Sequence, residues 1–158
     1  MGRPQFLSIL QFGGLLMVAV ALIPSGAHLF ELPNKIALPP EQYMTVQNIY
    51  RGWALFGIAI IGALLLTLAH TIAVRTDASA MLLSLMGALC IALSLAVFFV
   101  FTYPMNVATA NWTVMPADFE AARRQWEYSH AVNAVLMLAA FAALVLSVLT
   151  SRRVFLHG

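Results

Sequence analysis

Four long apolar stretches constrain the fold of this chain more than any other feature. They cover about residues 6–30, 52–74, 80–101 and 131–149, and ionisable side chains are nearly absent within them. A helix needs about 20 mostly apolar residues to cross the roughly 30 Å hydrocarbon layer of a bilayer. Lone strands and irregular backbone are excluded there, because lipid offers no partners to their N–H and C=O groups. We therefore predict an all-α protein that crosses the membrane four times.

The composition supports the same fold class. The chain has 158 residues, which suits a single integral membrane domain over 1–158, and 62% of them are hydrophobic while only 9% are charged. A soluble domain carries about 25% charged residues, so the outer surface of this chain must contact the lipid bilayer. The net charge of +2 and the absence of a basic run argue against a nucleic-acid partner. The single cysteine, Cys90, excludes an intramolecular disulfide and multi-cysteine metal motifs.

The first apolar stretch has two interpretations. Arg3, the apolar run after it and the small residues Ser25-Gly26-Ala27 also fit a signal peptide. The run is long for a signal peptide, so we favour a retained transmembrane helix.

The connections between the helices predict an asymmetric molecule. Pro40 with Glu41, and Pro116 with Asp118, each place a proline near a helix start and an acid in the first turn. The second helix is therefore predicted to start near Pro40 and the fourth near Pro116. Each would run for about 35 residues, or about 52 Å, which exceeds the bilayer thickness.

The two long connections, about 31–51 and 102–130, lie on the same face of the predicted bundle. The turn between helices two and three, 75–79, is short. We therefore expect an up-down-up-down four-helix bundle with a structured cap on one face. The sequence leaves a homo-oligomer open.

The charges give limited information on orientation. Four basic residues lie on each side of the predicted membrane. On the side of the termini they are Arg3, Arg75, Arg152 and Arg153, and on the cap side Lys35, Arg51, Arg123 and Arg124. The cap side also holds most of the acids, so its arginines are expected to be held in ion pairs. By the positive-inside rule we expect a multi-pass protein of the cell (inner) membrane with both termini in the cytoplasm.

The candidate chemistry lies at the cap-side membrane boundary. Helix one ends in the pair His28 and Glu31, and helix four enters the membrane with Glu127 and His130. A spacing of three places both members of a pair on one helix face, and the antiparallel helices place both histidines deeper than the glutamates. Ionisable residues at membrane depth are costly and usually face the bundle interior.

Other helices supply polar groups at the same level. Arg51 comes from helix two, and Tyr103 and Asn106 from the end of helix three. The tryptophans at this boundary, Trp53, Trp112 and Trp126, are typical interface anchors, and His70 at the other end of helix two is expected to be interfacial as well.

Three interpretations of the polar layer compete. In the first, it is a structural network in which Glu31 and Glu127 pair with Arg51 and with Arg123 or Arg124. In the second, His28, Glu31, Glu127 and His130 hold a single or dinuclear metal ion, as paired Glu-x-x-His motifs do in di-metal bundles. Haem held by the two histidines is a less favoured variant.

The third interpretation is a metal-free acid–base site. A histidine held by a carboxylate is a competent general base near neutral pH. Arg51 or Asn106 would then stabilise an enolate-like anion.

Two pairs of segments carry a family resemblance. They are Ala27-His-Leu-Phe-Glu-Leu-Pro-Asn-Lys35 with Tyr43-Met-Thr-Val-Gln-Asn-Ile-Tyr50, and Tyr103-Pro-Met-Asn106 with Arg124-Gln-Trp-Glu-Tyr-Ser-His130. Together they resemble the anthrone oxygenase-like family of small four-helix membrane proteins, most of whose bacterial members are uncharacterised. The similarity in layout spans nearly the whole chain, and its specific part is the pattern of Asn106, Trp126 and His130.

The resemblance implies an oxygenase. Characterised fungal members oxidise anthrones to anthraquinones with molecular oxygen, without a conventional cofactor. Carried over, His130 would be the base, with Glu127 or Glu31 orienting it and Asn106 and Trp126 beside it. Separately from the resemblance, we predict Tyr50, Arg51, Tyr103 and Arg124 as substrate-binding residues. One departure is Asn133, where the family pattern often has arginine.

Two functions remain open from the sequence. One is a membrane-embedded oxygenase-like protein acting on a lipophilic aromatic or quinone-type molecule, with a pocket lined by His28, Tyr103, Asn106 and His130. The other is a non-catalytic binding or accessory protein in which the same residues hold a metal or haem, or satisfy one another structurally. Whether the chain is an enzyme is not decided at this level.

Overall fold

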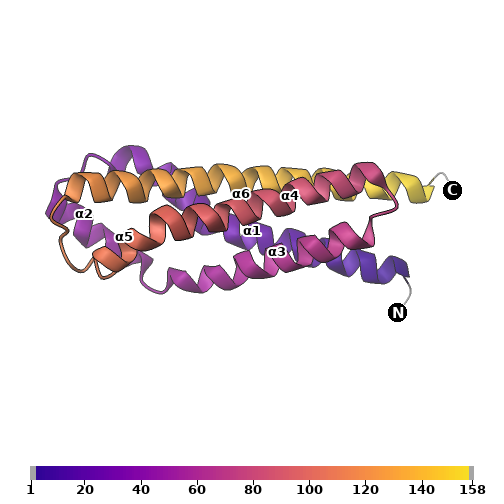
Figure 1. The fold of residues 1–158 in the computed structure, drawn as a ribbon, viewed down its shortest axis with the longest axis horizontal. Helices are drawn as coiled ribbons and strands as arrows, with labels where there is room; N and C mark the ends of the chain where they lie inside the picture. The colour runs from indigo at the N-terminus through magenta and orange to yellow at the C-terminus, as the bar shows by residue number, and fades with distance from the viewer. Residues whose placement is uncertain (1–2, 157–158) are drawn as a thin grey trace.

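The computed structural model describes the backbone of residues 3–156 and the side chains of residues 5–151. Four long helices run side by side along its length: α1 (Arg3–Lys35), α3 (Phe56–Ala73), α4 (Ala78–Val97) and α6 (Phe119–Leu156) (Figure 1). Residues 3–156 contain no strand. The predicted all-α fold is confirmed.

The four long helices form a closed ring in cross-section. Helix α1 packs against α3 and α6, and α4 packs against α3 and α6. Chain neighbours are therefore also spatial neighbours, and the last helix closes on the first. This is the up-down-up-down arrangement that short connections favour.

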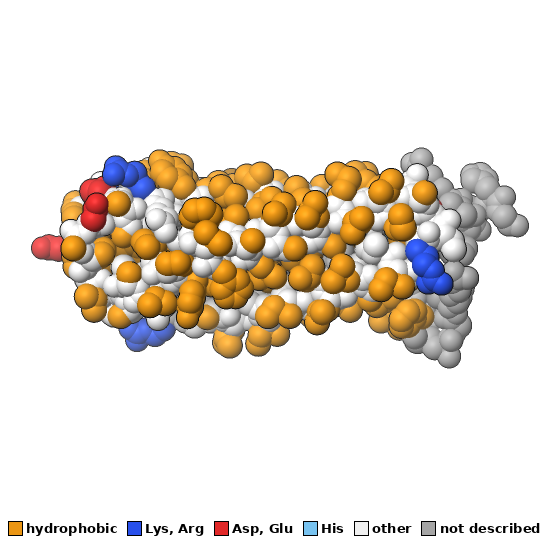
Figure 2. All heavy atoms as spheres, viewed as in Figure 1, with side chains coloured by type: hydrophobic (Ala, Val, Ile, Leu, Met, Phe, Trp, Pro, Cys, Tyr) orange, Lys and Arg blue, Asp and Glu red, His pale blue; other side chains and the backbone are white. Residues whose placement is uncertain are grey.

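All four helices are long and apolar enough to cross a bilayer. The candidate spans are Gln5–Lys35, Trp53–Ala73, Ala78–Ala108 and Phe119–Ser151. Large hydrophobic side chains cover the outside along the molecule, whereas the charged side chains on the visible face gather at its two ends (Figure 2). Such an apolar exterior requires lipid as its solvent, and the chain is a multi-pass integral membrane protein.

Small residues let the helices approach closely in the middle of the bundle. The core there combines alanines with Val18, Ile91 and Met137, all fully buried. A Cβ added to Gly87 of α4 would lie 3.1 Å from Leu144 Cγ of α6. Small residues at such crossings are typical of membrane bundles, where packing replaces the hydrophobic effect between helices.

Helix α6 is the uninterrupted long helix predicted from the proline signal. It begins at Phe119, and Asp118 caps it by accepting a hydrogen bond from the Ala121 backbone N–H at 3.0 Å. Its 38 residues exceed what a bilayer needs. The cap-side end of the helix carries Trp126 and Glu127 out beyond the deeper His130.

The predicted continuous second helix is wrong. The segment divides into α2 (Pro40–Gln47), a 3₁₀ turn η1 (Asn48–Tyr50), a second 3₁₀ turn η2 (Trp53–Leu55) and then α3. The break falls at Gly52, whose φ of +88° is left-handed and incompatible with a right-handed helix. The cap therefore folds back over the bundle end instead of extending α3 outward (Figure 1).

Helices one and three are longer than predicted. Helix α1 continues past residue 30 to Lys35, with Pro24 and Pro33 inside it. After α4 the chain continues through a π-helical segment η3 (Phe98–Thr102) into α5 (Tyr103–Ala108). Both extensions carry side chains into the cap.

The end opposite the cap has a polar cluster of its own. His70 is 2% exposed, so the prediction of an interfacial residue is wrong. Its Nδ1 lies 3.1 Å from Ser84 Oγ, and its Nε2 lies 3.5 Å from Nε2 of Gln11, which donates to Ser151 Oγ at 3.0 Å. These four residues come from four different helices. A small cavity with room for about one water molecule lies beside Gln11 and His70.

Candidate functional site

The site begins with an imidazole–carboxylate pair on α1. His28 is buried, and its Nδ1 lies 2.7 Å from Oε1 of Glu31, one helical turn away. The spacing of three places the two side chains on one face of the helix. A carboxylate at Nδ1 fixes the orientation of the ring and directs Nε2 away from the pair.

The two histidines meet across the α1–α6 contact. The ring centroids of His28 and His130 are 4.0 Å apart with an interplanar angle of 32°. Trp126, one helical turn before His130, packs edge-on against both rings, at 5.0 Å from His28 and 4.2 Å from His130. The sequence placed both histidines at the same depth, and the structure brings them into contact.

Lys35 is the cation of the site, and sequence reasoning did not assign it there. It is 3% exposed, and its Nζ lies 3.3 Å from Oε1 of Glu31 and 3.1 Å from Oε1 of Glu127. It also donates a hydrogen bond to the Tyr50 hydroxyl at 2.8 Å. Its spacing of four from Glu31 and seven from His28 places it on the same helix face, which is the signal that would have found it.

Glu127 lies at the centre of the cluster and is completely buried. Its Oε1 accepts a hydrogen bond from the Tyr43 hydroxyl at 2.8 Å, in addition to the contact with Lys35. Its Oε2 has no hydrogen-bond partner among the described residues. Among residues 5–151 no hydrogen bond joins either glutamate to His130, so the prediction that Glu127 or Glu31 orients His130 is wrong: Glu31 holds His28, and Glu127 holds Lys35 and Tyr43.

Aromatic rings enclose the histidines. The ring of Tyr50 lies 4.5 Å from that of His28, and the ring of Trp53 lies 5.5 Å from it, so the two residues on either side of the Gly52 break both cover the site. Trp126 donates from Nε1 to Oδ1 of Asn106 at 2.8 Å, which ties α6 to α5. The structure thus brings together Asn106, Trp126 and His130.

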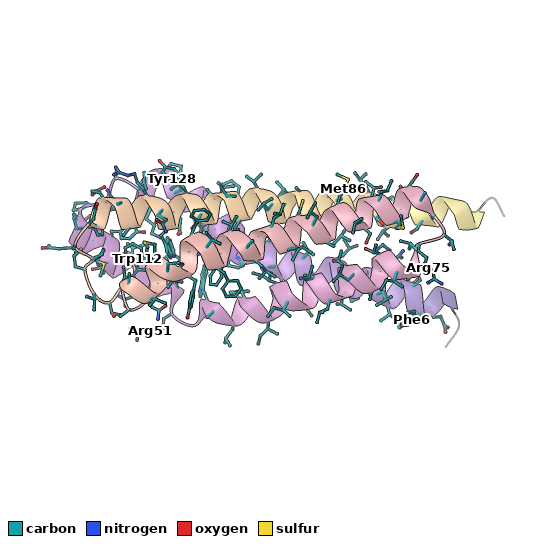
Figure 3. All side chains as sticks on the ribbon, in the orientation of Figure 1. Phe6, Arg51, Arg75, Met86, Trp112 and Tyr128 are labelled. Atoms are coloured by element: carbon teal, nitrogen blue, oxygen red, sulfur yellow. The ribbon has the colours of Figure 1, made fainter. Side chains whose placement is uncertain are left out.

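Trp112 and Trp126 are buried rather than interfacial. Trp112 lies inside the cap (Figure 3). It packs with Tyr43, Phe119 and Trp126 in a second core. It ends a run of three left-handed residues, Ala110, Asn111 and Trp112, at φ of 48°, 57° and 62°. The burial of the indole offsets the strain of this unusual backbone.

The two cap tyrosines are held as neutral phenols. Burial, together with the charge of Glu127, raises the pKa of Tyr43 well above its ordinary value. Burial, with the hydrogen bond and charge of Glu31, likewise raises the pKa of Tyr50. Both hydroxyls therefore act as hydrogen-bonding groups at neutral pH, not as bases.

Several residues predicted for the site lie outside it. Arg51 is exposed at the edge of the cap (Figure 3) and its guanidinium contacts Asn48 at 3.3 Å, because the Gly52 turn directs the segment outward. Tyr103 is half exposed and its ring packs near Phe98 and Phe99. Neither residue reaches the histidines.

The two consecutive arginines of α6 also differ from the prediction. Arg123 is buried but pairs with Glu120 at 2.6 Å and donates to the Leu38 carbonyl at 2.7 Å, not to Glu127. Arg124 is exposed on the next helix face. Lys35, and not an arginine as predicted, lies beside Glu127.

The four predicted metal ligands do not converge. Among the described residues no group of three or more His, Cys, Asp or Glu side chains is arranged to hold a metal ion. The physical reason is that Oε1 of each glutamate contacts the Lys35 ammonium, while the two imidazoles pack against each other at a tilt of 32°. As arranged, His28, Glu31, Glu127 and His130 form an ion-paired aromatic cluster.

Asn133 also lies on the site side of α6. It is buried, and its Oδ1 has no hydrogen-bond partner among the described residues. It follows His130 by three residues, where the related pattern often has arginine.

The comparisons with known proteins identify no relative. No family model matches the chain, and neither a curated protein nor a solved structure matches it.

Proposed function

We propose that the chain is a membrane-embedded oxygenase-like protein that acts on a lipophilic aromatic or quinone-type molecule. The observation that supports this most is the contact between His28 and His130. One imidazole is held by a carboxylate, and the other has no hydrogen bond to any described residue. A histidine without a partner, beside Trp126 and Asn106, is available to take a proton from a bound molecule.

The proposed reaction needs little besides a base. His130 removes a proton from an acidic benzylic CH₂ group, and the resulting carbanion is delocalised into the aromatic system. Molecular oxygen adds to this carbon, and loss of water leaves a carbonyl group. The balance is one CH₂ group and one O₂ giving one C=O and one H₂O, with carbon oxidised and oxygen reduced.

The surroundings of the histidines suit a planar aromatic molecule. Tyr50, Trp53 and Trp126 present rings that stack in offset or edge-on geometry, as aromatic pairs prefer. These rings occupy the space next to His28, so a substrate would have to displace the segment around Gly52 to reach the site. A single glycine in left-handed backbone is a suitable pivot for such a movement.

The test is oxygen uptake by purified protein with an anthrone as the probe. We expect acceleration over buffer that His130→Gln abolishes. His70→Gln is the matched control, because it removes the buried histidine at the opposite end of the bundle. The proposal fails for this substrate class if the wild-type protein gives no acceleration, or if folded His130→Gln retains the full rate.

A second candidate is a non-catalytic binding or accessory protein. It is favoured by the contacts that join Lys35 to Glu31, Glu127 and Tyr50 and join Tyr43 to Glu127, as in a structural ion-pair network. A metal-holding or haem-holding variant of this candidate would need rearranged side chains. Elemental analysis and a visible spectrum of purified protein test it, since a metal-free and colourless preparation contradicts both.

We also propose that both termini lie in the cytoplasm and that the cap lies outside the cell (inner) membrane. Of the four cap cations, Lys35 and Arg123 are in ion pairs while Arg51 and Arg124 are exposed, so the proposal rests on the basic residues that the sequence places at the other end, Arg3, Arg75, Arg152 and Arg153. Replacing Cys90 by alanine and placing single cysteines at Thr76 or Thr113 gives labels for either face. Labelling of Thr113→Cys by an impermeant reagent in intact cells is the expected result, and labelling of Thr76→Cys instead would reverse the orientation.

A further inference from the structure

The cap contains a cage for an ammonium ion, and Lys35 occupies it. The Lys35 Nζ lies 4.3 Å from the ring centroid of Tyr50, 4.6 Å from that of Trp126 and 5.1 Å from that of Tyr43. The carboxylates of Glu31 and Glu127 complete the enclosure at 3.3 and 3.1 Å. Aromatic faces and carboxylates around one cation are the arrangement by which proteins recognise ammonium ligands.

The charge of the cage is not balanced by Lys35 alone. Two carboxylates, from Glu31 and Glu127, face one ammonium group. The nearest other buried cation, Arg123, is paired with Glu120. Glu31 also contacts the His28 imidazole at 2.7 Å, whereas Glu127 has Lys35 as its only cationic partner among the described residues, so a cation from outside would bind at Glu127.

Glu127 offers a specific place for that cation. Its Oε2 is fully buried and accepts no hydrogen bond from any described residue, although its Oε1 has two donors. Leaving a buried carboxylate oxygen unpaired is costly, so a donor at this position is strongly favoured. An N–H group that is positively charged satisfies the oxygen and the charge together.

We propose that this cage binds the ammonium group of a lipophilic primary amine, which enters from the membrane and replaces that of Lys35. The amine takes the position among Tyr50, Trp126 and Glu127, and Lys35 acts as a tethered competitor for it. Lys35 is the last residue of α1, so its long side chain can turn toward the membrane surface when the cage is filled. Glu31, whose side chain is 24% exposed, lies at the accessible edge of the cluster.

This proposal does not depend on oxygen chemistry, and equilibrium binding tests it. The protein has three tryptophans, and Trp53 and Trp126 both contact His28, so indole fluorescence reports on the site. The protein in zwitterionic lipid vesicles is titrated with phenethylammonium and, separately, with the neutral isostere phenethyl alcohol. We expect a saturable fluorescence change with the ammonium probe and only a partitioning slope with the alcohol.

Three variants separate the cage from non-specific binding. Lys35→Ala removes the tethered competitor and is expected to tighten binding by about tenfold or more, since a desolvated cation–π contact is worth about 2 kcal/mol and 1.4 kcal/mol is tenfold. Glu127→Gln removes the buried charge and is expected to weaken binding by about tenfold or more, on the same scale. Glu41→Gln, an exposed acid on α2, is the matched control and should bind like wild type.

Each outcome decides the question. The proposal is overturned by any one of three results: equal saturable responses to the amine and the alcohol, unchanged binding by folded Glu127→Gln, or no tightening of binding in Lys35→Ala. If Glu127→Gln loses its near-ultraviolet circular dichroism and is unfolded, Glu31→Gln serves in its place. As independent confirmation, we expect phenethylammonium to restore the thermal stability of Lys35→Ala. The alcohol should not restore it.

Discussion

His28 of α1 and His130 of α6 stack with their ring centroids 4.0 Å apart, and only His28 has a carboxylate partner. The two rings therefore have different electrostatic surroundings although they touch. Glu31 also contacts Lys35. A change in the position or charge of either imidazole therefore affects the buried ion pairs of the cap.

The strongest stability effect is expected at Lys35. Lys35→Met leaves Glu127 buried without its cation, and breaking a buried pair in this way costs about 3–5 kcal/mol. The double variant Lys35→Met/Glu127→Gln should recover most of that loss, because the fully buried charge is gone and the partly exposed Glu31 keeps its contact with His28. Thermal unfolding in detergent, with Arg75→Met as an exposed control, measures both. Equal stability of the single variant and the control would show that the ion pairs contribute little.

Stability should fall at alkaline pH through the cap tyrosines. The folded state raises the pKa of Tyr43 and Tyr50, while the unfolded chain releases these protons near pH 10. The folded state therefore binds more protons above about pH 10, so the two phenols favour folding below that pH and this contribution is lost as pH rises.

The control for this effect is Tyr43→Phe/Tyr50→Phe. It keeps every other titrating group, so the difference in melting temperature between it and the wild type isolates the tyrosines. The wild type should begin to lose its advantage near pH 10, the ordinary tyrosine pKa, and should go on losing it as the pH rises further, because the folded-state pKa values lie well above 10. Parallel curves for the two proteins would contradict the raised pKa values.

The α4–α6 contact should be sensitive to volume at one glycine. Gly87→Val places atoms within about 3 Å of Leu144, which cannot move away easily because it is buried. We expect a loss of about 1–3 kcal/mol, as for other overpacked cores. Gly57→Ala is the matched control, since an added Cβ there meets nothing within 4 Å and alanine is the better helix former.

The left-handed turn before Trp112 should accept glycine. Ala110 is exposed at φ of 48°, and a left-handed L-residue costs about 1–2 kcal/mol that glycine avoids. Ala110→Gly is expected to raise the free energy of unfolding by about 1 kcal/mol, part of the gain being lost to the extra freedom of glycine in the unfolded chain. A destabilised Ala110→Gly protein would mean that the methyl group has contacts of its own.

The long helices could be predicted from the sequence because lipid leaves the backbone no alternative. Length and hydropathy are then sufficient, and α6 was predicted with its start within three residues of Pro116. The break at Gly52 could not be predicted in this way. A single glycine after an amphipathic run is compatible with either a helix or a break, and tertiary contacts of Tyr50 and Trp53 with His28 accompany the break.

Within the site, spacing along one helix was informative and pairing between helices was not. The contact of His28 with Glu31 follows from a period of 3.6 residues, and the same period places Glu127 and His130 on one face of α6 without a hydrogen bond between them. Which cation reaches Glu127 depends on how α1 and α6 are rotated about their axes. Hydropathy fixes that rotation poorly when the whole surface is apolar, and so Lys35 was missed and Arg51 and Arg124 were included.

The turn at Gly52 has a mechanical consequence for the whole molecule. A continuous α2–α3 helix would have transmitted any rotation of the cap to the opposite end as a rigid rod. With the hydrogen-bond ladder interrupted there, α1 and α6 are the helices that link the two ends without a break between His28 or Glu127 and the polar cluster of Gln11 and Ser151. Binding of a ligand at the cap would therefore displace α1 relative to α6 at the opposite end of the bundle. The hydrogen bond from Gln11 to Ser151 joins these two helices, so a change in this bond should be the first sign of the displacement.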